Sequence, residues 1–338
     1  MSKEYLKKVK IEKLSGCGIN YNIPVLKKHQ YYVVSGFTIT GDAPKEFIRA
    51  YEYGKVKKSN SKKWHLFIAK TGHKWYPIES ITEYLLNQLG IAFGLKMAES
   101  NVVMAGGQIR FMSKYFLKEE EELVHGADLF GGYLDDQDFV EEVECQDLAR
   151  DFFTLQFAEK SITFAYPFYD TIFQDFVKML LFDALVGNND RHFYNWGVVR
   201  HLTRDYKPVF SPIYDTARGL FWNESERKIA DLYNNKSRLN TYIGKYSKNS
   251  RPKIGWDGQK NINHFKLVTN IYNNEFGISK SEIESLFLRK NIDKLIDVVR
   301  KDFVNLLSKE RKEVIIECLN HRYDKIIAIF KKKEDKDD

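Results

Sequence analysis

Two short segments in the middle of the chain bring carboxylate and amide side chains together at a spacing that suits chemistry. Residues 187–198 read GNNDRHFYNWGV, with Asp190 five residues before Asn195, and residues 211–220 read SPIYDTARGL, where Asp215 ends a short apolar run. Phosphoryl transfer needs such a division of labour: one carboxylate accepts the proton of the attacking hydroxyl, and an amide oxygen and a second carboxylate hold Mg²⁺. The alternative is an ordinary surface turn, because Gly, Asn and Asp all favour turns.

A lysine and a glutamate upstream favour the chemical interpretation. Lys70 ends the apolar segment HLFIAK, and Glu83 lies in the next helical segment. In kinases an ion pair of this kind positions the lysine on the nucleotide phosphates. Each residue has an ordinary alternative, a lysine extending to solvent at a strand end and a glutamate on a solvated helix face. The ordered set Lys70, Glu83, Asp190, Asn195 and Asp215 is far less expected by accident.

The elements that must position these residues change in type along the chain. β-branched and aromatic segments predict strands at His29–Thr40, Phe47–Tyr53, Trp64–Lys70 and Val102–Leu117, the last folded at a Gly106-Gly107 turn. Apolar spacing predicts helices at Glu79–Leu89, closed by Gly90, and at Tyr169–Val186, and Ser279 with Glu282 forms a capping box for a further helix. Two more helical stretches follow, to about Lys331. Residues 223–264 are polar and predict a long irregular loop.

This order of elements predicts an α+β fold of two lobes. Residues 1–117 would form a β-rich N-terminal lobe with one helix, and residues 118–331 a mainly helical C-terminal lobe. Residues 332–338 (KKEDKDD) would be a disordered tail.

Charge is distributed unevenly along the 338 residues. Residues 1–75 contain 16 Lys and Arg against 5 Asp and Glu, whereas residues 118–151 contain 13 acidic residues against Lys118 and Arg150. A basic segment attracts nucleic acid or a phosphorylated small molecule, or is simply a solvated face. Because no helix-turn-helix or zinc-finger pattern is present, direct nucleic-acid binding is not expected.

The remaining composition points to a cytoplasmic protein. No apolar run reaches the roughly 18 residues that a membrane span needs. The N-terminal sequence MSKEYLKKVK lacks the apolar region of a secretory signal. Cys17, Cys145 and Cys318 lie far apart, which argues against a disulfide framework or a structural zinc site.

The two central motifs together resemble the HipA-like family of bacterial serine/threonine kinases. That family's catalytic loop runs G-N-x-D-R-H-x-x-N-W-G and its metal motif A-P-x-[YF]-D. The segment IAKTGHKWYPIESITEYLLNQLG is similar to its lysine strand and following helix, and FMSKYFL resembles the strand that enters the hinge between the lobes. The likeness spans roughly residues 47–220 and implies a protein-kinase-like fold of the short, stand-alone type.

The resemblance implies ATP and Mg²⁺ as cofactors and a role for each matching position. Asp190 would be the catalytic base, with Arg191 and His192 supporting the loop or the developing charge. Asp183 would be structural, hydrogen-bonding the loop backbone. The expected metal ligands are Asn195 and Asp215, and the expected ATP-binding residues are Lys70, Glu83, Ser113, Lys114, Tyr115 and Phe116.

One segment departs from the glycine-rich loops of ordinary kinases. Residues 54–63, GKVKKSNSKK, contain one glycine, so Lys55, Lys57 and Lys58 would have to replace backbone amides in holding phosphates. Ser59 and Ser61 are candidates for inhibitory autophosphorylation, or are plain turn residues.

The sequence therefore favours an ATP- and Mg²⁺-dependent serine/threonine protein kinase that also phosphorylates itself. The resemblance suggests a toxin–antitoxin component with an antitoxin partner, or another stand-alone bacterial effector, and the protein substrate is unknown. Two alternatives stay open. One is a phosphoinositide-type lipid kinase, which shares the D-R-H-x-x-N order, and the other is a non-catalytic, pseudokinase-like binding protein.

Overall fold

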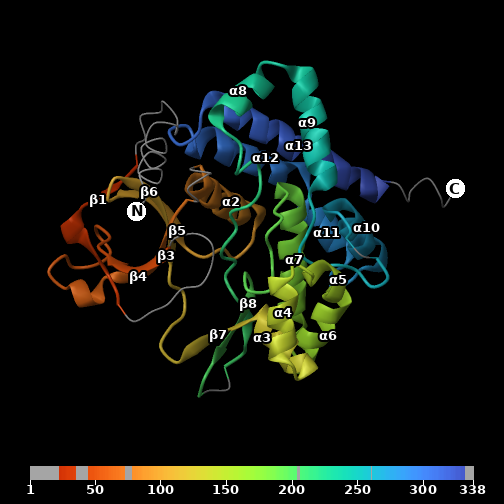
Figure 1. Cartoon of the computed structure of the whole chain (residues 1–338), viewed down its shortest axis with the longest axis horizontal. Coiled ribbons are helices and arrows are strands. Elements are labelled where there is room, and N and C mark those ends of the chain that lie inside the picture. Colours follow the sequence, from red (N-terminus) through yellow and green to blue (C-terminus); the bar gives the residue numbers. More distant parts are fainter. Residues whose placement is uncertain (1–22, 36–44, 73–77, 204–205, 260, 332–338) are drawn as a thin grey trace.

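The computed structural model describes residues 23–35, 45–72, 78–203, 206–259 and 261–331. Figure 1 shows a curled sheet on one side of the molecule and a group of helices on the other, with α2 between them. The predicted α+β layout of a β-rich region followed by a helical region is confirmed. The predicted tail, Cys17 and part of the strand expected at His29–Thr40 lie outside the described residues.

The N-terminal sheet has six strands in the order β1-β5-β6-β4-β3-β2. Its strands are β1 (Val25–Leu26), β2 (Tyr31–Val33), β3 (Lys45–Ala50), β4 (His65–Thr71), β5 (Ser100–Ala105) and β6 (Gln108–Lys114). β1 pairs with β5 in parallel, and the other pairs are antiparallel. The turn between β5 and β6 is formed as expected, with Gly106 and Gly107 both at positive φ.

Helix α2 (Glu79–Phe93) packs beside this sheet and carries Glu83. The helix does not end at Gly90, as the sequence suggested, but continues to Gly94, which adopts a left-handed φ of 98° and caps it. Gly90 serves instead for close packing, since a Cβ there would lie 2.4 Å from the Met97 sulfur.

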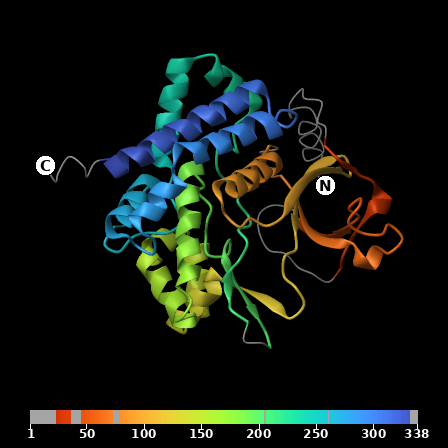
Figure 2. The ribbon, with the colours of Figure 1, turned by 180° about the vertical axis from the view of Figure 1, so that it is seen from behind.

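The C-terminal region contains most of the helices (Figure 2). They are α3 (Gly126–Leu134), α4 (Gln137–Cys145), α5 (Ala149–Phe152), α6 (Leu155–Ala165), α7 (Asp170–Val186), α8 (Glu226–Tyr233), α9 (Lys236–Asn249), α10 (His264–Asn274), α11 (Lys280–Leu286), α12 (Arg289–Asp297) and α13 (Lys309–Lys331). Short 3₁₀ turns occur at Lys28–Gln30 and Ser61–Lys63, and a π-helical turn at Val298–Asp302. The predicted helix ending at Val186 is α7, and the capping box of Ser279 and Glu282 opens α11 as expected.

The C-terminal region also holds a second sheet that the sequence did not predict. Its strands are β7 (Glu121–His125), β8 (Gly197–His201) and β9 (Val209–Phe210), in the order β7-β8-β9. β8 directly follows the loop of residues 187–196, which carries Asp190, and β9 leads toward Asp215. This sheet therefore holds the two central motifs next to each other.

The expectation of a long irregular loop over residues 223–264 is wrong. Residues 226–233 and 236–249 form α8 and α9, whose N-caps are the Ser225 and Asn235 side chains. Only four positions of these two helices are buried apolar residues, Ile229, Leu232, Leu239 and Ile243. Such sparse apolar stripes on a polar background hide a helix from pattern analysis.

One large apolar core joins α2 to the C-terminal helices and includes every apolar residue of α7. A small separate apolar cluster around Ile48, Phe67 and Met112 is formed by strands of the N-terminal sheet. No described helix has the length and apolarity to cross a bilayer. The division into lobes near residue 117 stays a prediction; Tyr115–Glu120 is the stretch that connects β6 to β7.

Candidate active site

Lys70 of β4 and Glu83 of α2 form a buried ion pair. The Lys70 Nζ lies 2.6 Å from Glu83 Oε1, and each side chain is less than a tenth exposed. Burial raises the pKa of Glu83 to about 7, with the Asp215 carboxylate adding to the rise and Lys70 opposing it. Burial alone would lower the pKa of Lys70, but Asp215 and Glu83 outweigh it and raise that pKa.

Asp215 joins this pair from the other end of the chain. The Lys70 Nζ lies 2.8 Å from Asp215 Oδ1, and the Lys45 Nζ lies 3.1 Å from Asp215 Oδ2. Burial would raise the pKa of Asp215, but the two lysines outweigh burial and hold that pKa well below its usual range. Asp215 has a left-handed φ of 51°, a conformation that aspartate, like asparagine, adopts more readily than most residues other than glycine.

Lys45 is a site residue that the sequence analysis missed. It opens β3, and in the antiparallel register it lies directly opposite Lys70. Side chains directly opposite in a pair of strands lie on the same face. The signal was available from the pairing of the two strands around residues 54–63, but the strand prediction began two residues too late, at Phe47.

The loop that carries Asp190, residues 187–196 and expected to be the catalytic loop, begins where α7 ends. Gly187 caps the helix with a left-handed φ of 70°, and a Cβ there would lie 2.7 Å from the Tyr246 hydroxyl. Asp183, in the last turn of α7, accepts hydrogen bonds from the side chains of Asn188 and Arg191. The contacts of its carboxylate are thus to loop side chains rather than to the loop backbone that we expected.

Arg191 is almost completely buried and ties the two central motifs together. Its guanidinium donates to Asp183, to the carbonyl oxygens of Asn195 and Tyr214, and to the Thr216 hydroxyl. These contacts support the loop. Arg191 does not line the cavity described below, so of its two expected roles the structure favours support of the loop over contact with the transferred phosphate.

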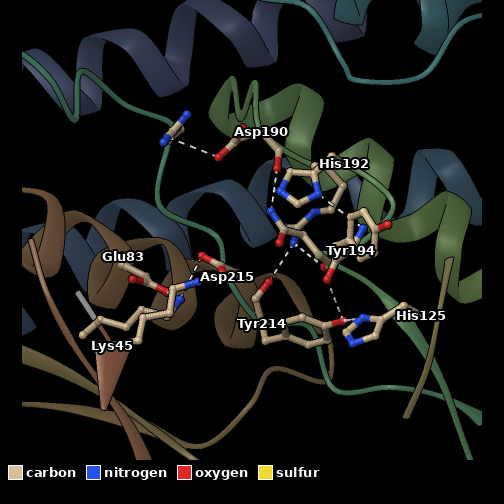
Figure 3. Close-up of polar contacts among 12 residues, drawn as sticks. Lys45, Glu83, His125, Asp190, His192, Tyr194, Tyr214 and Asp215 are labelled. Carbon is tan, nitrogen blue, oxygen red and sulfur yellow. Dashed lines mark hydrogen bonds and ion pairs between the residues drawn. The ribbon is translucent and has the colours of Figure 1, made fainter. Parts of the chain in front are cut away.

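Asp190 lies on the cavity side of the loop. Its carbonyl accepts a hydrogen bond of 2.8 Å from the Asn195 Nδ2, and its Oδ2 lies 3.2 Å from the Arg218 Nε (Figure 3). Burial raises the pKa of Asp190, although Arg218 opposes the rise. His192 follows two residues later, and burial lowers its pKa, so the ring is neutral near pH 7.

A cavity of about 650 Å³ collects residues from both regions of the chain. Of the eleven predicted site residues, the nine that line it are Lys70, Ser113, Lys114, Tyr115, Phe116, Asp190, His192, Asn195 and Asp215. Glu83 lies behind Lys70, and Arg191 is buried in the loop. Residues 54–63 contribute nothing to the lining, and Lys55 is bound to Glu52 and Glu99 instead. The lining of the cavity therefore gives no support to the expectation that Lys55, Lys57 and Lys58 hold phosphates.

The apolar end of the cavity lies at the end of β6. Phe47, Ile68 and Phe116 line it together with Leu117. The backbone amides of Lys114 and Tyr115 already donate to the backbone carbonyl oxygens of Glu99 and Leu66. The Lys114 ammonium lies 2.7 Å from the Glu99 carboxylate. A planar base in this end would therefore be held by apolar contact more than by these two amides.

Tyr214 connects the apolar end to the catalytic loop. Its hydroxyl donates to the Tyr194 carbonyl at 3.1 Å and lies 2.9 Å from the His125 Nδ1, as Figure 3 shows. Burial raises the pKa of Tyr214 far above its ordinary value, so the hydroxyl stays protonated. This network fixes the residue next to Asp215.

The donors in the cavity suit Mg²⁺. The Asn195 Nδ2 is bound to Asp190, which leaves the amide oxygen as the atom that can meet a cation, and the Asp215 carboxylate is ionised. No three His, Cys, Asp or Glu side chains gather as a metal site within the described part of the chain. Two hard oxygen donors agree with Mg²⁺, which keeps water and substrate phosphates in the rest of its shell.

Comparison with known families gives one match that covers most of the chain. The model of the HipA-like C-terminal domain matches residues 37–299. A curated relative, the serine/threonine-protein kinase CtkA of Helicobacter pylori (strain J99), is 23% identical over 248 residues, which cover 71% of this chain and 72% of the relative.

One solved structure shows the same fold. The crystal structure of the Helicobacter pylori proinflammatory kinase CtkA matches with a TM-score of 0.67 and 19% identity, covering 90% of this chain and 96% of that one. HipA of Shewanella oneidensis MR-1, solved with HipB and operator DNA, matches with a TM-score of 0.48 and 12% identity, covering 87% of this chain and 64% of that one. The second likeness is too weak to carry an argument.

Proposed function

The chain belongs to the HipA-like C-terminal domain family, and on that premise we propose that it is an ATP- and Mg²⁺-dependent serine/threonine protein kinase. The observation that supports this most is the meeting of Lys70, Asp215 and Asp190 on one cavity. The 23% identical relative named as a serine/threonine-protein kinase agrees with it.

The nucleotide would lie with its base against Phe47, Ile68 and Phe116 and its phosphates toward Lys70 and Lys45. Both ammonium groups already hold a carboxylate, so they are placed for anionic oxygens before the nucleotide arrives. Glu83 keeps Lys70 in place. Mg²⁺, held by Asn195 and Asp215, would supply positive charge to the phosphates.

In the reaction, the hydroxyl oxygen of a serine or threonine attacks the γ-phosphorus, and the bond from that phosphorus to the bridging oxygen of ADP breaks. The hydroxyl proton goes to the carboxylate of Asp190. Asp190 is anchored for this role by its carbonyl bond to Asn195 and by Arg218. Arg191 holds the loop that carries it.

Incubation with γ-labelled ATP and Mg²⁺ tests the proposal. We expect label on a Ser/Thr protein substrate or on the chain itself, lost in Asp190→Ala while Mg·ATP binding is retained, and Asp215→Ala should weaken that binding as well. Lys118→Ala is the matched control, because the Lys118 side chain is 83% exposed. Wild-type transfer by Asp190→Ala would remove the role given to Asp190.

The same assay separates the other interpretations. Transfer only to phosphoinositide vesicles would indicate a lipid kinase, and no ATP binding would indicate a binding protein. The antitoxin partner and autophosphorylation of Ser59 or Ser61 stay predictions. Co-purification with the product of a neighbouring gene, and mass spectrometry of the labelled chain, test them separately.

A further inference from the structure

Arg218 occupies a position that the kinase reaction does not by itself explain. It lies three residues after Asp215 and lines the cavity, yet its contact is with the other motif. Its Nε lies 3.2 Å from Asp190 Oδ2. The side chain thus joins the aspartate of one motif to the segment of the other.

Two further contacts fix Arg218 in this position. Its guanidinium carbon lies 5.3 Å from the centre of the Trp222 ring, within the range of a cation–π contact. Its carbonyl oxygen accepts a hydrogen bond of 3.2 Å from the backbone amide of Asn189, the residue before Asp190. The Trp222 ring therefore holds the guanidinium of Arg218, and the loop that carries Asp190 holds its backbone.

The ion pair between Arg218 and Asp190 engages one oxygen of the Asp190 carboxylate, Oδ2. A carboxylate has two oxygens, and a general base needs only one of them to face the hydroxyl that it deprotonates. An arginine on Oδ2 restricts rotation of the carboxyl group and leaves Oδ1 for the substrate. A residue that sets this angle acts on the rate, because catalysis is sensitive to small displacements of the reacting groups.

We propose that Arg218, stacked on Trp222, is the positioning residue that fixes the Asp190 carboxylate for attack by the substrate hydroxyl. This inference rests on the proposed kinase function and deepens it. It assigns to the motif that contains Asp215 a second task besides holding metal: keeping the Asp190 carboxylate oriented. The pair is partly exposed, with side chains 31% and 24% accessible, so its loss should affect the rate far more than the stability.

The test compares Arg218→Ala, Arg218→Lys and Trp222→Leu with the wild-type chain, using γ-labelled ATP, Mg²⁺ and the substrate that the wild type labels. For Arg218→Ala we expect kcat to fall about 10- to 100-fold with KM for ATP and the melting temperature nearly unchanged. Arg218→Lys should recover part of the rate, and Trp222→Leu should show a smaller loss of the same kind. Arg227→Ala is the control, since Arg227 is an exposed arginine of α8 that does not line the cavity.

Two additional measurements distinguish positioning from other roles. Millimolar guanidinium should restore part of the Arg218→Ala rate, whereas KCl at the same ionic strength should not. In an Asp190→Asn background, Arg218→Ala should change the residual rate less than about twofold, because its action passes through the carboxylate.

Three outcomes would overturn the inference. An unchanged or higher kcat in Arg218→Ala would mean that the arginine is dispensable or blocks the base. A further tenfold loss in the Asp190→Asn background would place Arg218 on the phosphate instead. Absence of any transfer by the wild type would overturn the proposed function itself, and the inference with it. This outcome is distinguished from the others because the wild type is assayed before any variant.

Discussion

The carboxylate of Asp215 concentrates the electrostatics of the site, because lysines from two neighbouring strands share it. Lys70 comes from β4 and Lys45 from β3, and the register places them opposite each other. When a nucleotide enters, both ammonium groups can turn from the carboxylate to phosphate oxygens. Lys45 should therefore contribute to ATP binding as much as Lys70, the lysine that the sequence predicted.

Lys45→Ala should raise KM for ATP about 10- to 100-fold, because a charge-assisted hydrogen bond is worth about 1.5–3 kcal/mol. Lys57→Ala, in the loop that does not line the cavity, should leave KM unchanged. Steady-state kinetics of the two variants side by side check this. Equal KM values would place the phosphates elsewhere.

ATP affinity should fall as the pH drops through about 7, because Glu83 then takes up a proton and releases Lys70. The effect of the same protonation on folding has the opposite sign. The pKa of Glu83 in the folded chain lies above the ordinary 4.5, so the contribution of Glu83 to stability grows as the pH falls from 7 to 4.5. Titrations of wild type and Glu83→Gln from pH 6 to 8 separate this effect from protonation of ATP; a parallel fall in both would exclude Glu83.

At the level of elements, the sequence predicted what depends on dense local signals. The broad apolar stripe of α7, the Gly106-Gly107 turn and the Ser279 capping box each specify their element within a few residues. α8 and α9 escaped because their helical signals are caps and four apolar positions. Lys45 and Arg218 escaped for another reason: their partners are 170 and 28 positions away, and only strand register and packing bring them together.

Helix α9, missing from the sequence prediction, supports both motifs through Tyr246. The hydroxyl accepts a hydrogen bond from the Leu220 amide at 3.0 Å and donates to the Gly187 carbonyl at 3.1 Å. Tyr246→Phe should lower the free energy of unfolding by about 0.5–1.5 kcal/mol, since the hydrogen bonds of the hydroxyl are lost while the Leu220 amide keeps the Val186 carbonyl as a partner. Urea denaturation measures this, with Tyr53→Phe, 92% exposed, as the control; equal losses would contradict it.

At the scale of the whole molecule, the large core fixes α2 to the C-terminal helices. Glu83 is thereby attached to the same body as Asp190, while Lys70 belongs to the sheet. A buried histidine, His264, makes the stability of this part of the molecule depend on pH. Burial, together with the nearby Arg322, holds the pKa of His264 well below 6.5.

The contribution of His264 to the stability of the fold should therefore fall as the pH drops below about 6.5. The unfolded chain then binds a proton that folded His264 refuses, at a cost of about 1.4 kcal/mol per pH unit for one such group. Thermal denaturation at pH 7.5 and 5.5 should show a smaller drop for His264→Phe than for the wild type. An identical drop would assign the effect to other groups.

The last long helix has a consequence for how activity arises during synthesis. Arg322 of α13 donates to the Ala184 carbonyl in the last turn of α7, and Arg311 of the same helix donates to the Phe221 carbonyl, beyond the second motif. Both motifs are synthesised about a hundred residues before these arginines. A nascent chain that already displays Asp190 and Asp215 thus still lacks the braces behind them, and we expect phosphotransfer to switch on only when translation passes α13.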